Sequence, residues 1–378
     1  MTHLNEHQLD HARELAKEKR QEVGRNQQVA ATIDTMKTRK KKVVSDEIIL
    51  SVDNLHVSFT TYGGSVQAVR GVSFDLHKGE TLAIVGESGC GKSVTSNAIM
   101  GLIPQPPGNI SDGKVMFKDL ELTKMNKKEL RKVQGVDISM IFQDPMTALN
   151  PTLTIGEQLM EGVRTHTNSS KAEAKEKAIA MLNLVGIPNP KERLKQFPHQ
   201  FSGGMRQRIV IAIALICEPE LLIADEPTTA LDVTIQAQIL ELFEEIQVKT
   251  GVSIVLITHD LGVVAKIADR IAVMYAGKII EIGTKREIFY TPQHPYTQGL
   301  LNSVPRLDLV GEELQPIEGT PPDLFAPPTG CPFTARCPFA MEVCDHVHPE
   351  TSNKSFTHRV DCWLQDDRAQ AVLTSAEK

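Results

Sequence analysis

The stretch GESGCGKS at residues 86–93 restricts the possible fold of this chain more than any other feature. It fits the pattern G-x-x-x-x-G-K-[ST] at every fixed position, follows the apolar run TLAIV and opens a helix-length segment. Its glycines let the backbone turn its N–H groups inward at the start of a helix, where the helix dipole favours an anion. The unit therefore predicts a phosphate-binding loop between a strand and a helix.

The polar side chains of this loop predict a nucleotide that is bound together with a metal ion. Lys92 is placed to reach the β- and γ-phosphates, and the Ser93 hydroxyl to ligate Mg²⁺. Cys90 is interpreted as a small side chain that the loop tolerates. The predicted nucleotide-binding residues of the loop and the helix start are Gly86, Glu87, Ser88, Gly89, Cys90, Gly91, Lys92, Ser93 and Val94.

A second element, LLIADEP at 221–227, is an apolar strand that ends in two carboxylates. Asp225 is placed to hold the Mg²⁺ shell, through water, and Glu226 to polarise the water that attacks the γ-phosphate. The alternative is that both carboxylates cap the next helix. Two acids at the end of a buried strand, in a chain with a phosphate loop, favour the catalytic interpretation.

Strand-like segments that alternate with helix-length stretches predict an α/β core with a largely parallel sheet. The expected strands lie at 48–59, 71–76, 81–86, 220–226, 252–260 and 270–277. Between about 120 and 205 the sequence is charged and periodic, which predicts a helical subdomain within a nucleotide-binding domain at 47–290. From 291 to 378 it is rich in proline and lacks periodicity, which predicts a small, irregular C-terminal domain.

Residues 1–46 predict a polar N-terminal extension: a solvated helix followed by the basic stretch KTRKKK at 37–42. Docking on a partner or on an anionic membrane surface is the alternative. The whole chain has a net charge of −6 although this stretch is basic, so the rest of the chain is acidic. An acidic chain disfavours nucleic acid as a partner. Because no signal-peptide core or membrane span is visible, we expect the chain to stay in the cytoplasm, with reduced thiols.

Further motifs between residues 48 and 290 give the chain a resemblance to the ATP-binding-cassette (ABC) ATPases. FSGGM at 201–205 resembles their LSGGQ signature, and Gln143 in MIFQDP resembles their Q-loop glutamine. TALD at 229–232 resembles the D-loop, and His259 in LITHD the switch histidine. The order and spacing of these motifs, together with the phosphate loop, match that family.

The resemblance implies a composite site. Two nucleotide-binding domains pair head to tail, so that Ser202, Gly203 and Gly204 contact the γ-phosphate of ATP held by the partner chain. His259 would hold the attacking water and Glu226 in register.

The remaining site residues are also assigned by this resemblance. Gln143 would sense the γ-phosphate and Mg²⁺ and relay closure to a membrane subunit. Asp232 of the D-loop joins the nucleotide-binding set. Tyr62, about two dozen residues before the phosphate loop, would stack on adenine, with Phe59 as its rival.

The segment TPQHPYTQGLLNSVP at 291–305 resembles the oligopeptide and dipeptide importer subfamily. This implies an ATPase that energises peptide import at the cytoplasmic face of the membrane. Its partners would be a second ABC ATPase in a heterodimer, two transmembrane permease subunits and an extracytoplasmic peptide-binding protein. Nickel and glutathione importers share the segment, and a soluble ABC ATPase acting on nucleic acid or ribosomes is a more distant alternative.

Four of the six cysteines lie near the C-terminus, at Cys331, Cys337, Cys344 and Cys362. Zinc ribbons usually pair cysteines two to four residues apart, and a reducing compartment disfavours disulfides. Thiolates in an irregular loop region suit a [4Fe–4S] cluster, and the resemblance adds that some peptide-importer ATPases carry one. Zinc and free thiols remain alternatives. We expect this site to lie outside the ATPase core and to stabilise or regulate it without taking part in hydrolysis.

Overall fold

The computed structural model describes residues 44–144, 148–229, 231–303 and 316–369. The predicted N-terminal helix and the basic stretch at 37–42 lie outside the described residues. The strands are β1 (Ile48–Thr61), β2 (Gly64–His77), β3 (Thr81–Val85), β4 (Gly108–Phe117), β5 (Leu120–Glu121), β6 (Ile138–Ile141), β7 (Leu221–Asp225), β8 (Ser253–Thr258), β9 (Arg270–Tyr275), β10 (Lys278–Thr284), β11 (Thr351–Asn353) and β12 (Arg359–Asp361). The α-helices are α2 (Lys92–Ile99), α3 (Lys127–Val133), α5 (Ile155–His166), α6 (Lys171–Leu184), α7 (Pro190–Arg193), α8 (Gly203–Leu215), α9 (Val233–Thr250), α10 (Leu261–Ile267), α11 (Lys285–Tyr290), α12 (Pro295–Asn302) and α13 (Glu342–His346).

The larger sheet has the order β11-β12-β10-β9-β3-β8-β7-β6. Its strands from β9 to β6 pair in parallel, whereas β10, β12 and β11 join antiparallel. Strands β3, β7 and β8 are buried at every residue, as expected for parallel strands that are covered on both faces. The prediction of an α/β core with a largely parallel sheet is therefore confirmed.

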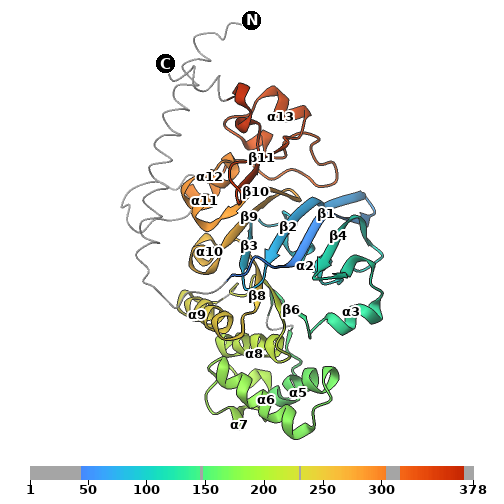
Figure 1. Cartoon of the computed structure of the whole chain (residues 1–378), viewed down its shortest axis with the longest axis vertical. Helices are drawn as coiled ribbons and strands as arrows, with labels where there is room; N and C mark the ends of the chain where they lie inside the picture. Colours follow the sequence, from blue (N-terminus) through green and yellow to red (C-terminus); the bar gives the residue numbers. More distant parts are fainter. Residues whose placement is uncertain (1–43, 145–147, 230, 304–315, 370–378) are drawn as a thin grey trace, which may run out of the picture.

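A second, antiparallel sheet in the order β2-β1-β4-β5 lies beside the larger one (Figure 1). Its inner face packs Leu55, Val69 and Phe74 into one core cluster with Leu82 of β3 and Ile99 of α2. Strand β4 is not predicted from the sequence, because GNISDGKVMF carries few apolar residues and two glycines. This sheet supports the strand and the helix on either side of the phosphate loop.

Helices α5 to α8 form the lower lobe of the molecule in Figure 1. Thr154 and Ser170 begin α5 and α6 with capping boxes, in which Glu157 and Glu173 bond back to the cap residues. The region predicted as helical also contains the strand β6, which pairs with β7 in the larger sheet, so that part of the prediction is wrong. An apolar run of four residues, ISMI, cannot be assigned to helix or strand by periodicity.

The C-terminal region is joined to the core sheet and is not a separate irregular unit. Strand β12 pairs with β10, and β11 pairs with β12. Tyr275 of β9 and Tyr296 of α12 share a buried cluster with Phe333. Strands of three residues are too short to show an alternating pattern, which explains why the sequence suggests an appended domain.

Glu287 of α11 holds residues 355–357 against the core by hydrogen bonds. It accepts hydrogen bonds from Ser355 Oγ at 2.5 Å and from Thr357 Oγ1 at 2.9 Å. Partial burial alone would raise the pKa of Glu287, but these bonds and those from Thr284 lower it to about 2.

A carboxylate with a lowered pKa stabilises the fold above its unfolded pKa of about 4.3, and this contribution is lost as the pH falls towards 2. Glu287→Gln should therefore lower Tm by about 2 °C or more at neutral pH. The difference from wild type should shrink at about pH 3. Thermal unfolding at both pH values measures this, and an equal difference at both would contradict the assignment.

Candidate functional site

Three neighbouring strands bring the predicted site residues to one edge of the larger sheet. The parallel register pairs Val85 with Thr258 and Asp225 with Ile257, so β3, β7 and β8 end side by side. The phosphate loop follows β3, Glu226 follows β7 and His259 follows β8. The carboxyl ends of parallel strands are where α/β folds bind ligands.

The phosphate loop needs glycine at two positions because the backbone of other elements comes close. A Cβ atom on Gly86 would lie 2.1 Å from the Met274 carbonyl oxygen. A Cβ on Gly91 would lie 2.3 Å from the Ala68 carbonyl oxygen, and Gly91 also has a φ of 103°. Ser88 and Gly89 are exposed at the crest of the loop.

Lys92 lies across the loop, almost completely buried. Its Nζ donates hydrogen bonds of 2.8 Å to the carbonyl oxygens of Gly86 and Glu87. Cys90 is buried beneath the loop in the core, in agreement with a small packed side chain, and Val94 packs partly against the same core. A cation held on a loop of small residues at a helix start is suited to bind phosphate oxygens.

The Ser93 hydroxyl donates a hydrogen bond of 3.0 Å to Asp225 Oδ1. Burial raises the pKa of Asp225. A divalent cation between these two oxygen ligands would favour the ionised carboxylate and would offset that effect. The donor set therefore fits Mg²⁺, which binds oxygen ligands and few protein side chains.

Glu226 is the centre of a hydrogen-bonded group. Gln143 Nε2 donates to its Oε2 at 2.9 Å, and Thr229 Oγ1 donates to the same oxygen at 2.9 Å. His259 Nδ1 lies 3.1 Å from its Oε1. Partial burial alone would raise the pKa of Glu226, but the bonds from His259 and Thr229 outweigh it and lower the pKa.

The backbone of Glu226 has a φ of 46°, a conformation that non-glycine residues rarely adopt. Such strain is typical of functional positions. The structure thus brings three predicted residues together, Gln143, Glu226 and His259. Thr229 is a fourth member that the sequence analysis leaves without a role, although it stands at the start of the TALD segment.

The signature residues are not part of this group. Ser202 accepts a hydrogen bond from the Met205 N–H and so begins α8, and a Cβ on Gly204 would lie 2.8 Å from Ile235. Within the described ranges these residues make no hydrogen bond to the phosphate loop. Asp232 caps α9 by accepting from the Ile235 N–H at 2.9 Å.

The two aromatic candidates for adenine stacking differ in exposure. Tyr62 is fully exposed in the turn between β1 and β2. Phe59 packs against the core cluster. An exposed ring is available to a ligand, and Tyr62 stays the residue predicted to stack on adenine.

Two further residues, which no sequence motif assigned to the site, contact the phosphate loop. Arg336 forms a two-bond ion pair with Glu87, at 2.7 and 3.0 Å. The hydroxyl of Tyr296 accepts a hydrogen bond of 3.0 Å from the Glu87 N–H. Tyr296 belongs to the HPYT segment, and that motif could have pointed to it. Arg336 lies between two cysteines, and no sequence motif marks it as a contact of the phosphate loop.

The four C-terminal cysteines form no disulfide with one another in the described part of the chain. Burial, with smaller contributions from charge on the neighbouring thiols, raises the pKa of Cys331 to about 11 and those of Cys337 and Cys362 to about 12. The thiols are therefore near enough to interact electrostatically. Across the ranges that the structure describes, no three His, Cys, Asp or Glu side chains converge tightly enough to hold a single metal ion.

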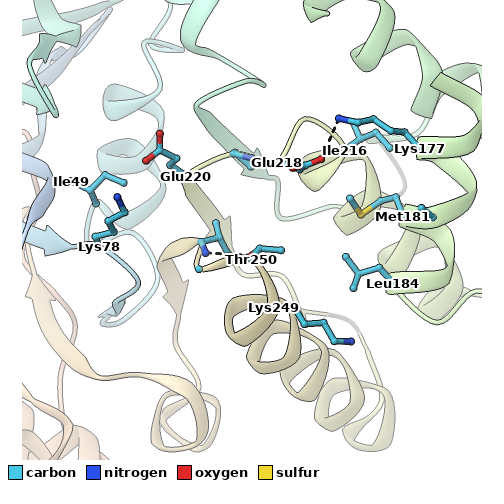
Figure 2. A pocket seen from close by; sticks show the side chains of 14 residues that line it. Ile49, Lys78, Lys177, Met181, Leu184, Ile216, Glu218, Glu220, Lys249 and Thr250 are labelled. Atoms are coloured by element: carbon cyan, nitrogen blue, oxygen red, sulfur yellow. Dashed lines mark hydrogen bonds and ion pairs between the residues drawn. The ribbon is translucent and has the colours of Figure 1, made fainter. Parts of the chain in front are cut away.

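A cavity of about 690 Å³ lies away from this site (Figure 2). Lys177 and Glu218 form an ion pair of 3.2 Å on its wall, and Lys249 and Glu220 also line it. Glu220 precedes β7, whereas Asp225 ends that strand, so the cavity lies at the opposite end of the sheet from Asp225 and Glu226.

Family models match two parts of the chain. Residues 69–229 match "ABC transporter", and residues 280–344 match "Oligopeptide/dipeptide transporter, C-terminal region". The first range contains the phosphate loop, Gln143 and Glu226. The second contains the HPYT segment and three of the four cysteines.

Curated relatives match most of the chain. The dipeptide transport ATP-binding protein DppD of Bacillus subtilis is 69% identical, over 88% of this chain and 99% of that protein. The oligopeptide transport ATP-binding protein OppD of the same organism is 59% identical, over 86% of this chain and 91% of that protein.

Two solved structures share the fold of the central region. A dimer of the ATP-binding cassette MJ0796 with ADP and phosphate has a TM-score of 0.56 and 26% identity, over 62% of this chain and 98% of that one. CbiO1 of Clostridium perfringens has a TM-score of 0.56 and 28% identity, over 65% of this chain and 92% of that one. Across the described residues, no helix is long and apolar enough to cross a membrane.

Proposed function

Because this chain belongs to the family of ABC transporter ATP-binding proteins that includes DppD and OppD, we propose that it hydrolyses ATP to energise the import of dipeptides or oligopeptides. The observation that carries this proposal is the group around Glu226, where Gln143, Thr229 and His259 all contact one carboxylate beside the phosphate loop. The match of the C-terminal region to peptide transporters supports the substrate class.

In the proposed reaction, Lys92 and the loop N–H groups hold the triphosphate, and Tyr62 stacks on adenine. Ser93 and Asp225, with Gln143, would hold Mg²⁺, which would supply positive charge to offset that of the phosphates. Glu226 accepts a proton from the attacking water. Its lowered pKa keeps it ionised and able to accept that proton, and His259 holds it in position.

We propose that Ser202, Gly203 and Gly204 act on ATP held by a second ATPase subunit. Two observations support this: these residues make no hydrogen bond to their own phosphate loop in the described part of the chain, and a structural neighbour is a dimeric cassette. Asp232 accepts a hydrogen bond from the Ile235 N–H, and Ile235 lies against Gly204 of the signature segment. Asp232 would therefore lie at the same interface. ATP would close the pair and hydrolysis would reopen it, because ATP binds the two states with different affinity.

The partners that we propose are a second, different ATPase, two transmembrane permease subunits and an extracytoplasmic peptide-binding protein. DppD and OppD are named as the ATP-binding proteins of peptide transport, and this supports an assembly with the other parts of a transporter. The chain would then sit on the permease at the cytoplasmic face of the membrane.

For Cys331, Cys337, Cys344 and Cys362 we propose a [4Fe–4S] cluster. Burial raises the pKa of Cys331, Cys337 and Cys362, so a bound cation is needed to keep these three thiols as thiolates. A cluster is wider than one ion, so it does not require the tight convergence that zinc does. The cluster would cross-link a loop-rich region with a small core.

Anaerobic purification tests this proposal. Wild-type protein should be brown and contain iron and sulfide, and Cys344→Ser should lose the colour and lower Tm. Cys217→Ser, at a free cysteine outside the cluster set, is the matched control and should stay brown. A colourless wild-type protein that contains zinc would overturn the assignment.

A further inference from the structure

The phosphate loop carries its own carboxylate, Glu87, directly after the first glycine. Arg336 neutralises it with two parallel hydrogen bonds of 2.7 and 3.0 Å, the strongest geometry for such a pair. The arginine side chain is only 5% exposed and the glutamate 27%. A pair this sheltered is screened far less by salt than a surface ion pair.

Arg336 is itself held rigidly. Its remaining N–H groups donate to the carbonyl oxygens of Glu318 and Ile317 at 2.8 and 3.1 Å, and to the Tyr275 hydroxyl at 3.2 Å. Its guanidinium also lies over the rings of Tyr275 and Phe333. The geometry of the Glu87 side chain is therefore set by the C-terminal region.

A second contact fixes the backbone of the same loop residue. Tyr296 is fully buried, and its hydroxyl accepts from the Glu87 N–H at 3.0 Å. Its ring packs against Tyr275 and Phe333, with centroids 4.5 and 5.4 Å apart. His294 Nδ1 accepts from the Tyr296 N–H at 3.0 Å and so begins α12 at this point.

The C-terminal region also touches the hairpin that carries Tyr62. The Gln67 N–H donates to the Leu324 carbonyl at 2.9 Å. A Cβ on Gly63 would lie 3.7 Å from the Phe325 ring. The region thus contacts both sides of the nucleotide site, the phosphate loop and the adenine-side turn.

We propose that the C-terminal region is a positioning element of the ATP site, in which Arg336 neutralises and holds Glu87 while Tyr296 fixes the loop backbone. Without Arg336, an unpaired carboxylate would stand on the loop that is proposed to hold the triphosphate, and its charge would repel that group. Without either residue, ATP binding would have to order a looser loop, at a cost in affinity. This goes beyond the transport role, because the region acts on nucleotide affinity and not on the chemical step.

The test compares ATP turnover by the assembled transporter carrying Arg336→Gln or Tyr296→Phe. The KM for ATP should rise about tenfold for Arg336→Gln, the loss expected for a charge-assisted bond, and less for Tyr296→Phe. The kcat should stay near the wild-type value. Arg368→Gln, which breaks an exposed ion pair with Asp366, is the matched control and should leave the KM unchanged.

The decisive variant adds Glu87→Gln to Arg336→Gln. If repulsion by the freed carboxylate weakens ATP binding, the double variant should bind ATP several times more tightly than Arg336→Gln alone. A purely structural role predicts no such rescue, and that result would overturn the proposal. Should Arg336→Gln fail to fold, Tyr296→Phe decides: a wild-type KM in that variant also overturns it.

Discussion

Replacing Glu226 with glutamine should lower ATP turnover by the assembled transporter about a hundredfold or more, the usual contribution of a general base. Glutamine keeps the size of the side chain and an oxygen that can accept the bond from Gln143 or Thr229. It loses the charge that accepts a proton from water. ATP binding should survive, because the phosphate loop is untouched, and the closed ATP-bound pair should accumulate.

Turnover and nucleotide retention measured on the same preparation check this expectation. Glu220→Gln is the matched control, because Glu220 precedes the same strand and pairs with Lys118 far from the site. It should hydrolyse ATP at the wild-type rate. Wild-type turnover in Glu226→Gln would show that another group is the base.

Lys92→Met should weaken ATP binding by about tenfold to a hundredfold, because a charged hydrogen bond to phosphate is lost. Methionine has a similar length and suits the buried position of Lys92. Equilibrium titration with a fluorescent ATP analogue measures the affinity directly. Lys249→Met, on the wall of the cavity in Figure 2, is the control and should bind ATP normally. Unchanged affinity in Lys92→Met would contradict its role at the phosphates.

These two variants separate binding from chemistry. Lys92→Met should not retain nucleotide, whereas Glu226→Gln should retain it and not hydrolyse it. The difference follows from position: Lys92 is bonded to the loop that holds the phosphates, and Glu226 stands beyond the end of β7 with His259. A single defect shared by both variants would argue against two distinct roles.

Local patterns predicted the phosphate loop and the strand that ends in Asp225. The glycines of the phosphate loop and the apolar run before Asp225 are dictated by short-range geometry, so the sequence reveals them. Gln143 and His259 were assigned by resemblance alone, and the structure places both on Glu226. Strands as short as β6 and β12 carry too few residues to show a period.

The contacts of the C-terminal region with the phosphate loop were not predictable from the sequence. Arg336 reaches Glu87 across 249 positions of sequence, and nothing local marks an arginine between two cysteines as a partner of the phosphate loop. The C-terminal region was therefore expected to stand apart from the ATPase core. In the structure it continues the core sheet and touches the loop.

Peptide uptake by the reconstituted transporter tests the central claim most directly. Proteoliposomes containing both ATPases, the permease and the peptide-binding protein should accumulate a labelled peptide only when ATP is supplied on the side of this chain. Glu226→Gln should abolish accumulation while the peptide-binding protein still binds its ligand. ATP hydrolysis without any peptide accumulation, or full accumulation with Glu226→Gln, would contradict the account.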